Sequence, residues 1–239
     1  MKPAIVASCF IAVSCYAQST AWEPLFDGRT PAGWRTQSRD AFPYHAWKIE
    51  DGCLRSIGTA PRVDLSTAGT FRNFELEFEW KLSAGVNSGV KYLVFGMRPN
   101  PASGKIDPDV PKALGFELQL VDDSTDADAK LAPSHSTGAL YLFVAPHDVP
   151  PLTVGRWHTA KIHVNGRQIE HWLDGVCVMQ ADLESDSLRS AMANQRRADI
   201  PKPRHLDELR ANPAKTYPIV LTHHGGDAWY RSLRIRELQ

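Results

Sequence analysis

The sequence is short of cysteine and has no long apolar run. Two of its four cysteines fall within the first seventeen residues, so Cys53 and Cys177 are the one pair that could form a disulfide in the body of the chain. The longest apolar stretch near the start, residues 4–13, is much shorter than the roughly 20 residues that a membrane-spanning helix requires. The sequence therefore predicts no membrane span and at most one intramolecular disulfide.

An excess of charge of either sign is also missing. The 239 residues include 27 lysines and arginines and 27 aspartates and glutamates, which gives a formal net charge of zero. Binding to nucleic acid requires a basic excess, so we exclude DNA and RNA as partners. The sequence likewise has no Gly-x-Ser-x-Gly nucleophile elbow and no phosphate-cradling glycine loop, and neither body cysteine has an activating motif. Ser-His-Asp catalysis and thiol catalysis are therefore without support.

The first seventeen residues have the composition of a secretory leader. Lys2 precedes the apolar run, and Ser-Cys-Tyr-Ala17 offers a conventional cleavage position. We expect a signal peptide at residues 1–17, a single domain at residues 18–239, and export to the periplasm or the extracellular space. Alternatively, Ala12-Val-Ser-Cys15 resembles a bacterial lipoprotein site, in which case lipid on Cys15 would hold the protein at a membrane surface.

Strand patterns dominate the body of the chain. Residues 70–82 show the clearest strand pattern, in which apolar residues from Phe74 to Leu82 alternate with charged ones, as a strand with one buried face requires. Further strand-like runs lie at residues 47–56, 90–95, 116–121 and 138–144, and two Asx-Gly turns, Asn165-Gly166 and Asp174-Gly175, divide residues 157–179 into an antiparallel meander. No crossover helices appear between the runs, so the pattern predicts an all-β sandwich of two antiparallel sheets.

Two long segments interrupt the strand pattern. Residues 97–112 are rich in proline and glycine, and residues 181–218 have helix-like pieces around residues 188–193 and 205–209. Loops of this length in a compact domain are often functional, although a solvated flap would have the same composition. We therefore expect one long, partly helical insertion in the sandwich.

One predicted strand carries a polar pair. Glu117 and Gln119 share one strand face about 7 Å apart, while the alternating apolar residues point into the core. Nearby in the pattern, Gly85-Val-Asn87-Ser88-Gly89 reads as a permissive turn whose amide and hydroxyl groups suit sugar hydroxyls. An ordinary solvated strand face would look the same, so the pair alone does not identify a site.

Residues 219–235 combine histidines, glycines and aromatic residues between two strand-like runs. His224 is a natural acid or base, because the unperturbed pKa of histidine is about 6.5. His223 adjoins it, but neighbouring strand residues face opposite sides. The two could therefore share a metal with Asp227 only if regular strand geometry broke at Gly225.

A series of motifs covers nearly all of residues 23–238 in a fixed order. They are Glu23-Pro-Leu-Phe-Asp27-Gly28, Gly33-Trp34, Trp47-Lys-Ile-Glu-Asp51-Gly52, Phe74-Glu-Leu-Glu-Phe-Glu-Trp80, Asn87-Ser-Gly89, Phe116-Glu-Leu-Gln119, Thr137-Gly-Ala-Leu-Tyr141, His171-Trp-Leu-Asp-Gly175 and His224-Gly225. Together they resemble the 3-keto-disaccharide hydrolase family. The resemblance implies a concanavalin A-like lectin/glucanase jelly roll with its active site on the concave sheet. The chain departs from the family at Thr222-His223-His224-Gly225, where Gln-Asp-His-Gly is usual, and in lacking the usual Ser-x-Phe before it.

The resemblance also implies a set of site residues. It places Glu117, Gln119, Asn87, Tyr141 and His224 at the positions of the family's active site. We take His224 and Glu117 as the catalytic pair and the other three as contacts to an oligosaccharide or glycoside substrate. A divalent metal is one option as a cofactor.

Four more residues complete the predicted substrate contacts. Ser88 lies within Asn87-Ser-Gly89, Asp122 follows Phe116-Glu-Leu-Gln119 after two residues, and His171 lies in the meander. Trp229 is a candidate platform on which a sugar ring could stack.

The substrates of that family carry a ketone at C3, which acidifies the hydrogen on C2. A base can remove this hydrogen and expel the C1 substituent by elimination, after which water adds back. Such a site needs a base, an electrophile for the enolate oxygen and an acid for the leaving group, but no nucleophilic carboxylate. We expect His224 or Glu117 to be the base and the other to be the acid or an orienting group.

Two alternatives use the same fold. Laminarinase-like enzymes carry Glu-x-Asp-x-x-Glu, and Glu117-Leu-Gln119-Leu-Val-Asp122 keeps this spacing without the middle carboxylate. A retaining pair must lie about 5–5.5 Å apart, which Glu117 and Asp122 could reach only across a bulge, because their odd offset puts them on opposite faces. A non-catalytic carbohydrate-binding module would instead use the concave sheet and Trp229 without any titrating residue.

Overall fold

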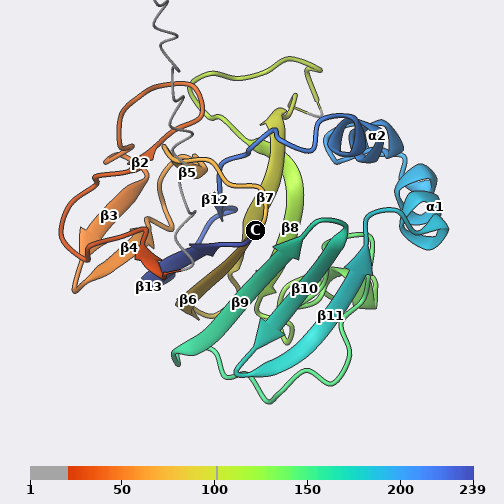
Figure 1. Cartoon of the computed structure of the whole chain (residues 1–239). Coiled ribbons are helices and arrows are strands. Elements are labelled where there is room, and N and C mark those ends of the chain that lie inside the picture. Colours follow the sequence, from red (N-terminus) through yellow and green to blue (C-terminus); the bar gives the residue numbers. More distant parts are fainter. Residues whose placement is uncertain (1–20, 101) are drawn as a thin grey trace, which may run out of the picture.

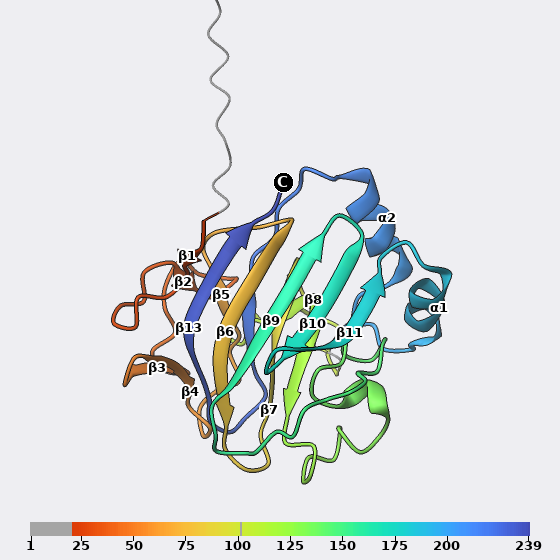
Figure 2. The same cartoon turned by 60° about the horizontal axis from the view of Figure 1, so that its bottom comes forward.

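The computed structural model describes residues 21–100 and 102–239. In this part of the chain the strands form two antiparallel sheets, stacked as the layers of a sandwich (Figure 1, Figure 2). The larger sheet has the order β11 (Val176–Asp182), β10 (Gln168–Leu173), β9 (His158–Asn165), β6 (Phe74–Leu82), β13 (Ala228–Glu237), β4 (Cys53–Ser56) and β3 (Trp47–Glu50), with β1 (Glu23–Pro24) paired to β13. The smaller sheet has the order β2 (Trp34–Arg35), β5 (Leu65–Thr67), β12 (Val220–His223), β7 (Asn87–Met97) and β8 (Ala113–Val121). The predicted all-β sandwich is confirmed.

Several local predictions are also confirmed. Strand β6 buries every second residue along its whole length, as its alternation requires. Strands β3 and β4 form a hairpin across Asp51-Gly52, and β9, β10 and β11 form the expected meander. Asp51 and Gly52 have φ of 49° and 74°, the left-handed conformation that a tight hairpin turn demands.

Two local predictions were wrong. Residues 138–144 form turns rather than a strand, because Leu140 bridges both Leu118 and Val144 and the chain folds back at Leu142, whose φ is 72°. The segment Asn87-Ser88-Gly89 belongs to β7 and is not a turn; the turn lies before it, at Gly85. Both differences come from pairing with strands distant in the sequence, which local propensity does not encode.

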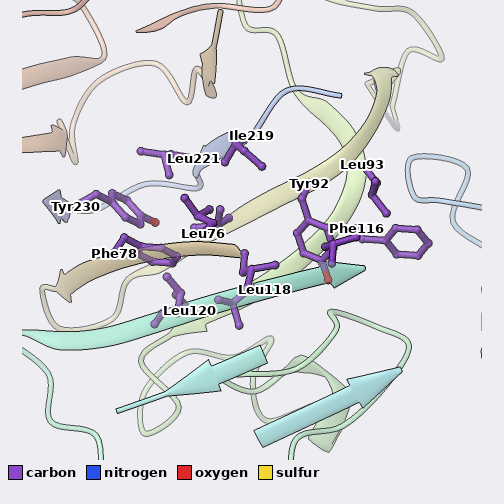
Figure 3. Close-up of a cluster of buried hydrophobic side chains, with 14 of the residues drawn as sticks. Leu76, Phe78, Tyr92, Leu93, Phe116, Leu118, Leu120, Ile219, Leu221 and Tyr230 are labelled. Carbon is purple, nitrogen blue, oxygen red and sulfur yellow. The ribbon is translucent and has the colours of Figure 1, made fainter. Parts of the chain in front are cut away.

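The core fills the space between the two sheets. Figure 3 shows Leu76 and Phe78 of β6 packed with Leu118 of β8, Leu221 of β12 and Tyr230 of β13. Burying an aliphatic or aromatic side chain of this size contributes about 1.5–3 kcal/mol. Since alternate residues point inward, the remaining residues of β7 and β8 must face away from the core, and these form the floor of the site described below.

The predicted helical insertion lies at one edge of the sandwich. It contains α1 (Asp186–Asn194) and α2 (Pro203–Ala211), which follow edge strand β11 (Figure 1). The Ser185 side chain accepts a hydrogen bond from the Leu188 amide and caps α1, while Pro203 begins α2. Leu188 and Leu206 are buried and join the main core, so the insertion is packed onto the domain. A short 3-10 helix, η1 (Pro133–His135), lies in the loop after β8.

The structure bears on two further expectations from composition. Cys53 and Cys177 are free thiols on β4 and β11, and four strands separate these two in the sheet. Strands are spaced by about 4.8 Å, so the thiols lie some 24 Å apart and cannot pair. Of the helices described in residues 21–100 and 102–239, none is long and apolar enough to cross a membrane. The predicted leader and Cys15 lie outside the described residues.

Candidate active site

A cleft of about 610 Å³ opens on the face of the smaller sheet that looks away from the core. Lys91 of β7 and Glu117 and Gln119 of β8 form its floor, because the residues that alternate with them point into the sandwich. The segments that follow β4, β6, β7, β8, β11 and β12 build its walls. Segments far apart in the sequence therefore converge over one small patch of sheet.

Glu117 is the buried carboxylate of this floor, with a side chain that is 6% exposed. Its Oε1 accepts a hydrogen bond from the Thr222 hydroxyl at 3.1 Å, and its Oε2 lies 3.5 Å from the Lys91 ammonium. Burial alone would raise the pKa of Glu117, but the charges of Lys91 and His224 outweigh it and lower the pKa to about 2. Glu117 is therefore ionised at neutral pH.

His224 stands directly above Glu117, just after β12 ends. Its Nε2 lies 3.8 Å from Glu117 Oε1, and 27% of its side chain is exposed, so the ring is open to the cleft. Burial lowers the pKa of His224, the nearby Lys112 lowers it further, and Glu117 opposes both. The imidazole is thus neutral at pH 7 and able to accept a proton, with a carboxylate in place to stabilise the imidazolium that would form.

A glycine makes room for the Glu117 carboxylate and His224. Gly89 of β7 lies opposite Gln119 in the register, and the Glu117 carboxylate rests against its bare backbone. A Cβ at position 89 would lie 2.6 Å from Glu117 Oε1 and 2.8 Å from the Leu118 carbonyl oxygen. Glycine is therefore required here by close approach.

We expect Gly89→Ala to displace the Glu117 carboxylate and destabilise the protein by about 1–3 kcal/mol, the usual cost of overpacking. Since Glu117 raises the pKa of His224, the displacement should lower that pKa further, as an NMR titration of the histidines would show. Gly115→Ala is the matched control, because its Cβ would crowd Val94 at 2.8 Å and leave Glu117 alone. An unchanged His224 titration in Gly89→Ala would contradict this account.

Two amide side chains continue the floor beside Glu117 and His224. Gln119 Nε2 donates a hydrogen bond to Asn87 Oδ1 at 3.3 Å, and both residues line the cleft. This bond leaves the Gln119 carbonyl oxygen and the Asn87 amide nitrogen for other partners. One acceptor and one donor side by side are well suited to adjacent hydroxyls of a sugar ring.

Tyr141 reaches the cleft from the folded-back segment after β8. Its hydroxyl donates a hydrogen bond to Asp128 Oδ2 at 2.8 Å and accepts one from Arg197 Nη1 at 3.5 Å. Burial, reinforced by Asp128, raises the pKa of Tyr141 well above its usual value, so the hydroxyl stays protonated. Tyr141 is consequently a donor and not a base at neutral pH.

An ion cluster fixes the insertion to the cleft wall. Asp199, whose side chain is 3% exposed, binds Arg98 Nη1 at 2.5 Å and Arg197 Nη2 at 2.9 Å. Burial alone would raise the pKa of Asp199, but the two guanidinium groups outweigh it and lower the pKa. The cluster joins residues after α1 to the end of β7, which places Arg197 over the cleft.

Comparison with known proteins agrees with this geometry. Residues 21–236 match the 3-keto-alpha-glucoside-1,2-lyase-like domain. The chain belongs to this family. A 3-keto-disaccharide hydrolase of Bacteroides thetaiotaomicron (strain VPI-5482) is 29% identical over 227 residues, which cover 90% of this chain and 77% of the relative. The family expected from the sequence motifs is thereby confirmed, and with it membership in a family of enzymes.

Several solved structures of other proteins have the same fold as this chain. Two structures described as a "putative glycosyl hydrolase" from Parabacteroides distasonis ATCC 8503 superpose with TM-scores of 0.70 and 0.66 at 21% and 24% identity. Each covers 91% of this chain, which covers 94% and 100% of theirs. A Bacillus subtilis protein of unknown function with a galectin-like fold has a TM-score of 0.50 at 11% identity and covers 91% of this chain, which covers 94% of it. The expected concanavalin A-like jelly roll is confirmed.

Two of the predicted substrate contacts, Ser88 and Asp122, lie inside the protein and not in the cleft. Ser88 is 1% exposed and faces the core, where its hydroxyl donates to the Thr222 carbonyl at 2.6 Å and lies 2.7 Å from the Tyr230 hydroxyl. Asp122 accepts hydrogen bonds from the Gly85 amide at 2.8 Å and from the hydroxyls of Ser124 and Thr125 in its own loop. Both stabilise the ends of β7 and β8.

The other two contacts lie farther away. His171 is fully buried between the sheets, where Tyr92 donates to its Nε2 at 2.7 Å and its Nδ1 donates to the Gly138 carbonyl at 3.0 Å. Burial lowers its pKa to about 4, so it stays neutral. Trp229 lies on the outer face of the larger sheet under the Lys81 ammonium, which is 4.4 Å from its ring. The structure brings together five of the nine predicted residues and leaves these four outside.

His223 and His224 face different sides of the sheet, so the option of a metal shared by both with Asp227 has no support in this geometry. His223 faces the core side, where its Nε2 donates to the Ile57 carbonyl at 3.1 Å and its Nδ1 accepts from the Gly225 amide at 3.2 Å. Asp227 binds Arg55 at 2.8 Å instead. Among residues 21–100 and 102–239 no three histidine, cysteine, aspartate or glutamate side chains are grouped to hold a metal ion.

Sequence reasoning missed several residues of the cleft. Lys91 could have been found, since the parity of β7 puts it on the face of Asn87 and opposite Glu117 in the register. Arg197 and Asp199 gave no such signal, because a loop outside the strands carries them. The sequence predicted the insertion that contains them as a segment but did not single out these two side chains.

Proposed function

We propose that this protein cleaves 3-keto-glycosides, including 3-keto-disaccharides, by elimination followed by hydration. The observation that carries the proposal is the pair formed by neutral, partly exposed His224 and ionised, buried Glu117 on the floor of the cleft. Membership of the lyase-like family and the name of the Bacteroides thetaiotaomicron relative, 3-keto-disaccharide hydrolase, support it.

His224 serves as the base. It removes the proton from C2, which the C3 ketone acidifies, and the electron pair moves into an enolate. The enolate then expels the oxygen substituent from C1, and this oxygen takes up the proton that the His224 imidazolium returns. Glu117 has a pKa of about 2 and is too weak a base for this step, but its negative charge stabilises the imidazolium on His224. Addition of water to the resulting double bond then yields the free 3-keto sugar.

The remaining cleft residues hold the substrate and its developing charge. Lys91 and Arg98 line the cleft. Each is paired with a carboxylate of the protein, and its remaining N–H groups can donate hydrogen bonds to the enolate oxygen. Gln119 and Asn87 offer an acceptor and a donor to the sugar hydroxyls. Tyr141 provides a neutral hydroxyl whose orientation Asp128 fixes.

The laminarinase-like alternative lacks its second carboxylate. Asp122 does not line the cleft, and its oxygens are occupied by hydrogen bonds at the end of β8. A retaining pair of carboxyls about 5–5.5 Å apart is therefore not formed with Glu117. The binding-module alternative relied on Trp229, which lies on the other sheet.

The proposal is tested by incubating the protein with 3-keto-glucosides and with their unoxidised parents. We expect 3-ketoglucose from the keto substrates alone, and in D₂O the product should gain solvent deuterium at C2, with 3-ketoglucose incubated without protein as the exchange control. A parallel arm with chelator reports whether a divalent ion takes part. Release of glucose from the parents would contradict the proposal in favour of direct glycoside hydrolysis, and no release from either would favour a binding module.

We also propose that the protein is exported. The support is the pattern of residues 1–17, a lysine and a short apolar run followed by small residues. Cleavage after Ala17 would release the protein to the periplasm or the medium, whereas lipidation of Cys15 would retain it at a membrane surface.

A further inference from the structure

The cleft continues into a second cavity, where the loop after β7 crosses the sheet. This side cavity has a volume of about 300 Å³ and shares Arg62 and Arg98 with the cleft. Lys112 and Asp107 also line it, so its lining residues include three cations and one carboxylate. A ligand that extends from the cleft into the side cavity therefore meets mostly positive charge.

Two of these cations are already neutralised. Lys112 donates to Asp64 at 2.9 Å, and Arg98 binds Asp199 at 2.5 Å. The carboxylate of Asp107 accepts backbone hydrogen bonds from Asp109 and from the next residue in its own turn. These groups form a preorganised polar wall, with their charges largely satisfied within the protein.

Arg62 differs from them. Within residues 21–100 and 102–239 it has no ion pair and no hydrogen bond, and it is exposed at the boundary of the two cavities. The Arg62 side chain lies next to the end of β12. A Cβ added to Gly225 would lie 3.3 Å from both Nε and Nη2 of Arg62. Gly225 directly follows His224, so the free guanidinium borders the site where C1 loses its substituent.

We propose that the side cavity receives the group expelled from C1 and that Arg62 binds an anionic oxygen group on it, which makes 3-keto-glycosides with an acidic aglycone the preferred substrate class. This inference rests on the proposed function. A guanidinium presents two parallel N–H groups that match a carboxylate, and such charge-assisted pairs are the stronger and more specific hydrogen bonds. An arginine without a partner in the described part of the chain keeps all of these donors for the ligand.

The test compares two 3-keto-glucosides whose aglycones differ only in charge, 4-hydroxybutyrate and its amide. For each protein the quantity measured is the ratio of kcat/KM for the carboxylate substrate to kcat/KM for the amide substrate. We expect the wild-type ratio to exceed one and to fall as salt is added, since exposed charge pairs are screened. Arg62→Gln should lower the ratio about tenfold, and Arg62→Lys should restore part of it because it restores the charge without the planar fork.

Arg29→Gln is the matched control, because Arg29 is an exposed arginine outside the cleft with no ion pair in the described residues. It should keep the wild-type ratio, and unfolding temperatures should confirm that each variant is folded. Turnover of both substrates with a wild-type ratio of one or below would overturn the inference and leave the proposed function intact. An equal fall in Arg29→Gln would also overturn it, because general charge and not Arg62 would then set the preference. No turnover of either substrate would overturn the proposed function itself, and the inference with it.

Discussion

His224→Ala should lower kcat/KM for a 3-keto-glucoside by about 10²–10⁴-fold, the usual contribution of a positioned general base. The imidazole is the one cleft group described here that is both neutral at pH 7 and placed against a buried carboxylate. Steady-state release of 3-ketoglucose measures the effect. Turnover in His224→Ala within a few-fold of wild type would remove His224 from the mechanism.

The adjacent histidine provides the matched control. His223 is buried and packs its ring edge against Trp47, so His223→Ala should lower the unfolding temperature while leaving kcat within a few-fold of wild type. Of the two variants, His224→Ala should therefore lose catalytic activity and His223→Ala should lose stability. Similar losses of kcat in both variants would contradict this assignment.

The pH profile gives a second check on the same base. Burial lowers the pKa of His224, so the neutral form persists below its ordinary value of about 6.5 and activity should hold through that pH before falling at more acidic pH. Glu117→Gln removes a charge that raises this pKa, and the acid limb should then move to still lower pH. An acid limb above pH 6.5 in the wild-type protein would contradict the model of a desolvated base.

Asp64→Asn should destabilise the protein by about 3–5 kcal/mol, the cost of leaving a buried ion without its partner. Asp64 is 1% exposed and holds three segments together: it accepts from Lys112 at 2.9 Å, from the Ala113 amide at 2.9 Å and from the His223 amide at 3.2 Å. Urea unfolding measures the loss. Asp207→Asn, which breaks the exposed pair with Arg189, is the control and should cost less than about 1 kcal/mol.

The same residue predicts how stability depends on pH. Burial would raise the pKa of Asp64, but Lys112 and Lys91 outweigh it and lower the pKa from 3.8 to about 2. Because the folded pKa is the lower one, this contribution is complete above about pH 4 and is lost as pH falls through about 2. Unfolding free energies measured across this range should fall less steeply in Asp64→Asn, and equal slopes in both proteins would contradict the assignment.

The elements that could be predicted were those whose signal is local. The alternation of residues 74–82 and the Asx-Gly turns specified strands and hairpins because side-chain direction has a period of two and a tight turn demands left-handed φ. Residues 138–144 look like another strand, but Leu140 bridges both Leu118 of β8 and Val144 of its own segment, so the segment folds back on itself. The prediction failed there because a bridge to a distant residue outweighs local propensity.

The site residues likewise include some that local sequence could place and some that it could not. Glu117, Gln119 and Asn87 could be assigned to one face from parity and from the family motifs, and the structure places them together on the cleft floor. Ser88 and His171 have the same polar chemistry but face the core, where Tyr230 and Tyr92 satisfy them. Polarity alone does not distinguish a residue that binds a ligand from one that binds another buried side chain.

The sequence by itself determined the all-β class and the family, because alternation, turns and ordered motifs are properties of neighbouring residues. It also led us to propose His224 and Glu117 as the catalytic pair. Only the tertiary structure decided that His224 lies over Glu117 while His223 points to the core, and that Gly89 makes space for the carboxylate. It also decided that Arg62 has no partner among the residues that the structure describes. The physical reason is that burial, charge pairing and close approach depend on which distant segments meet. Those contacts set the pKa values and the free donors on which the chemistry depends.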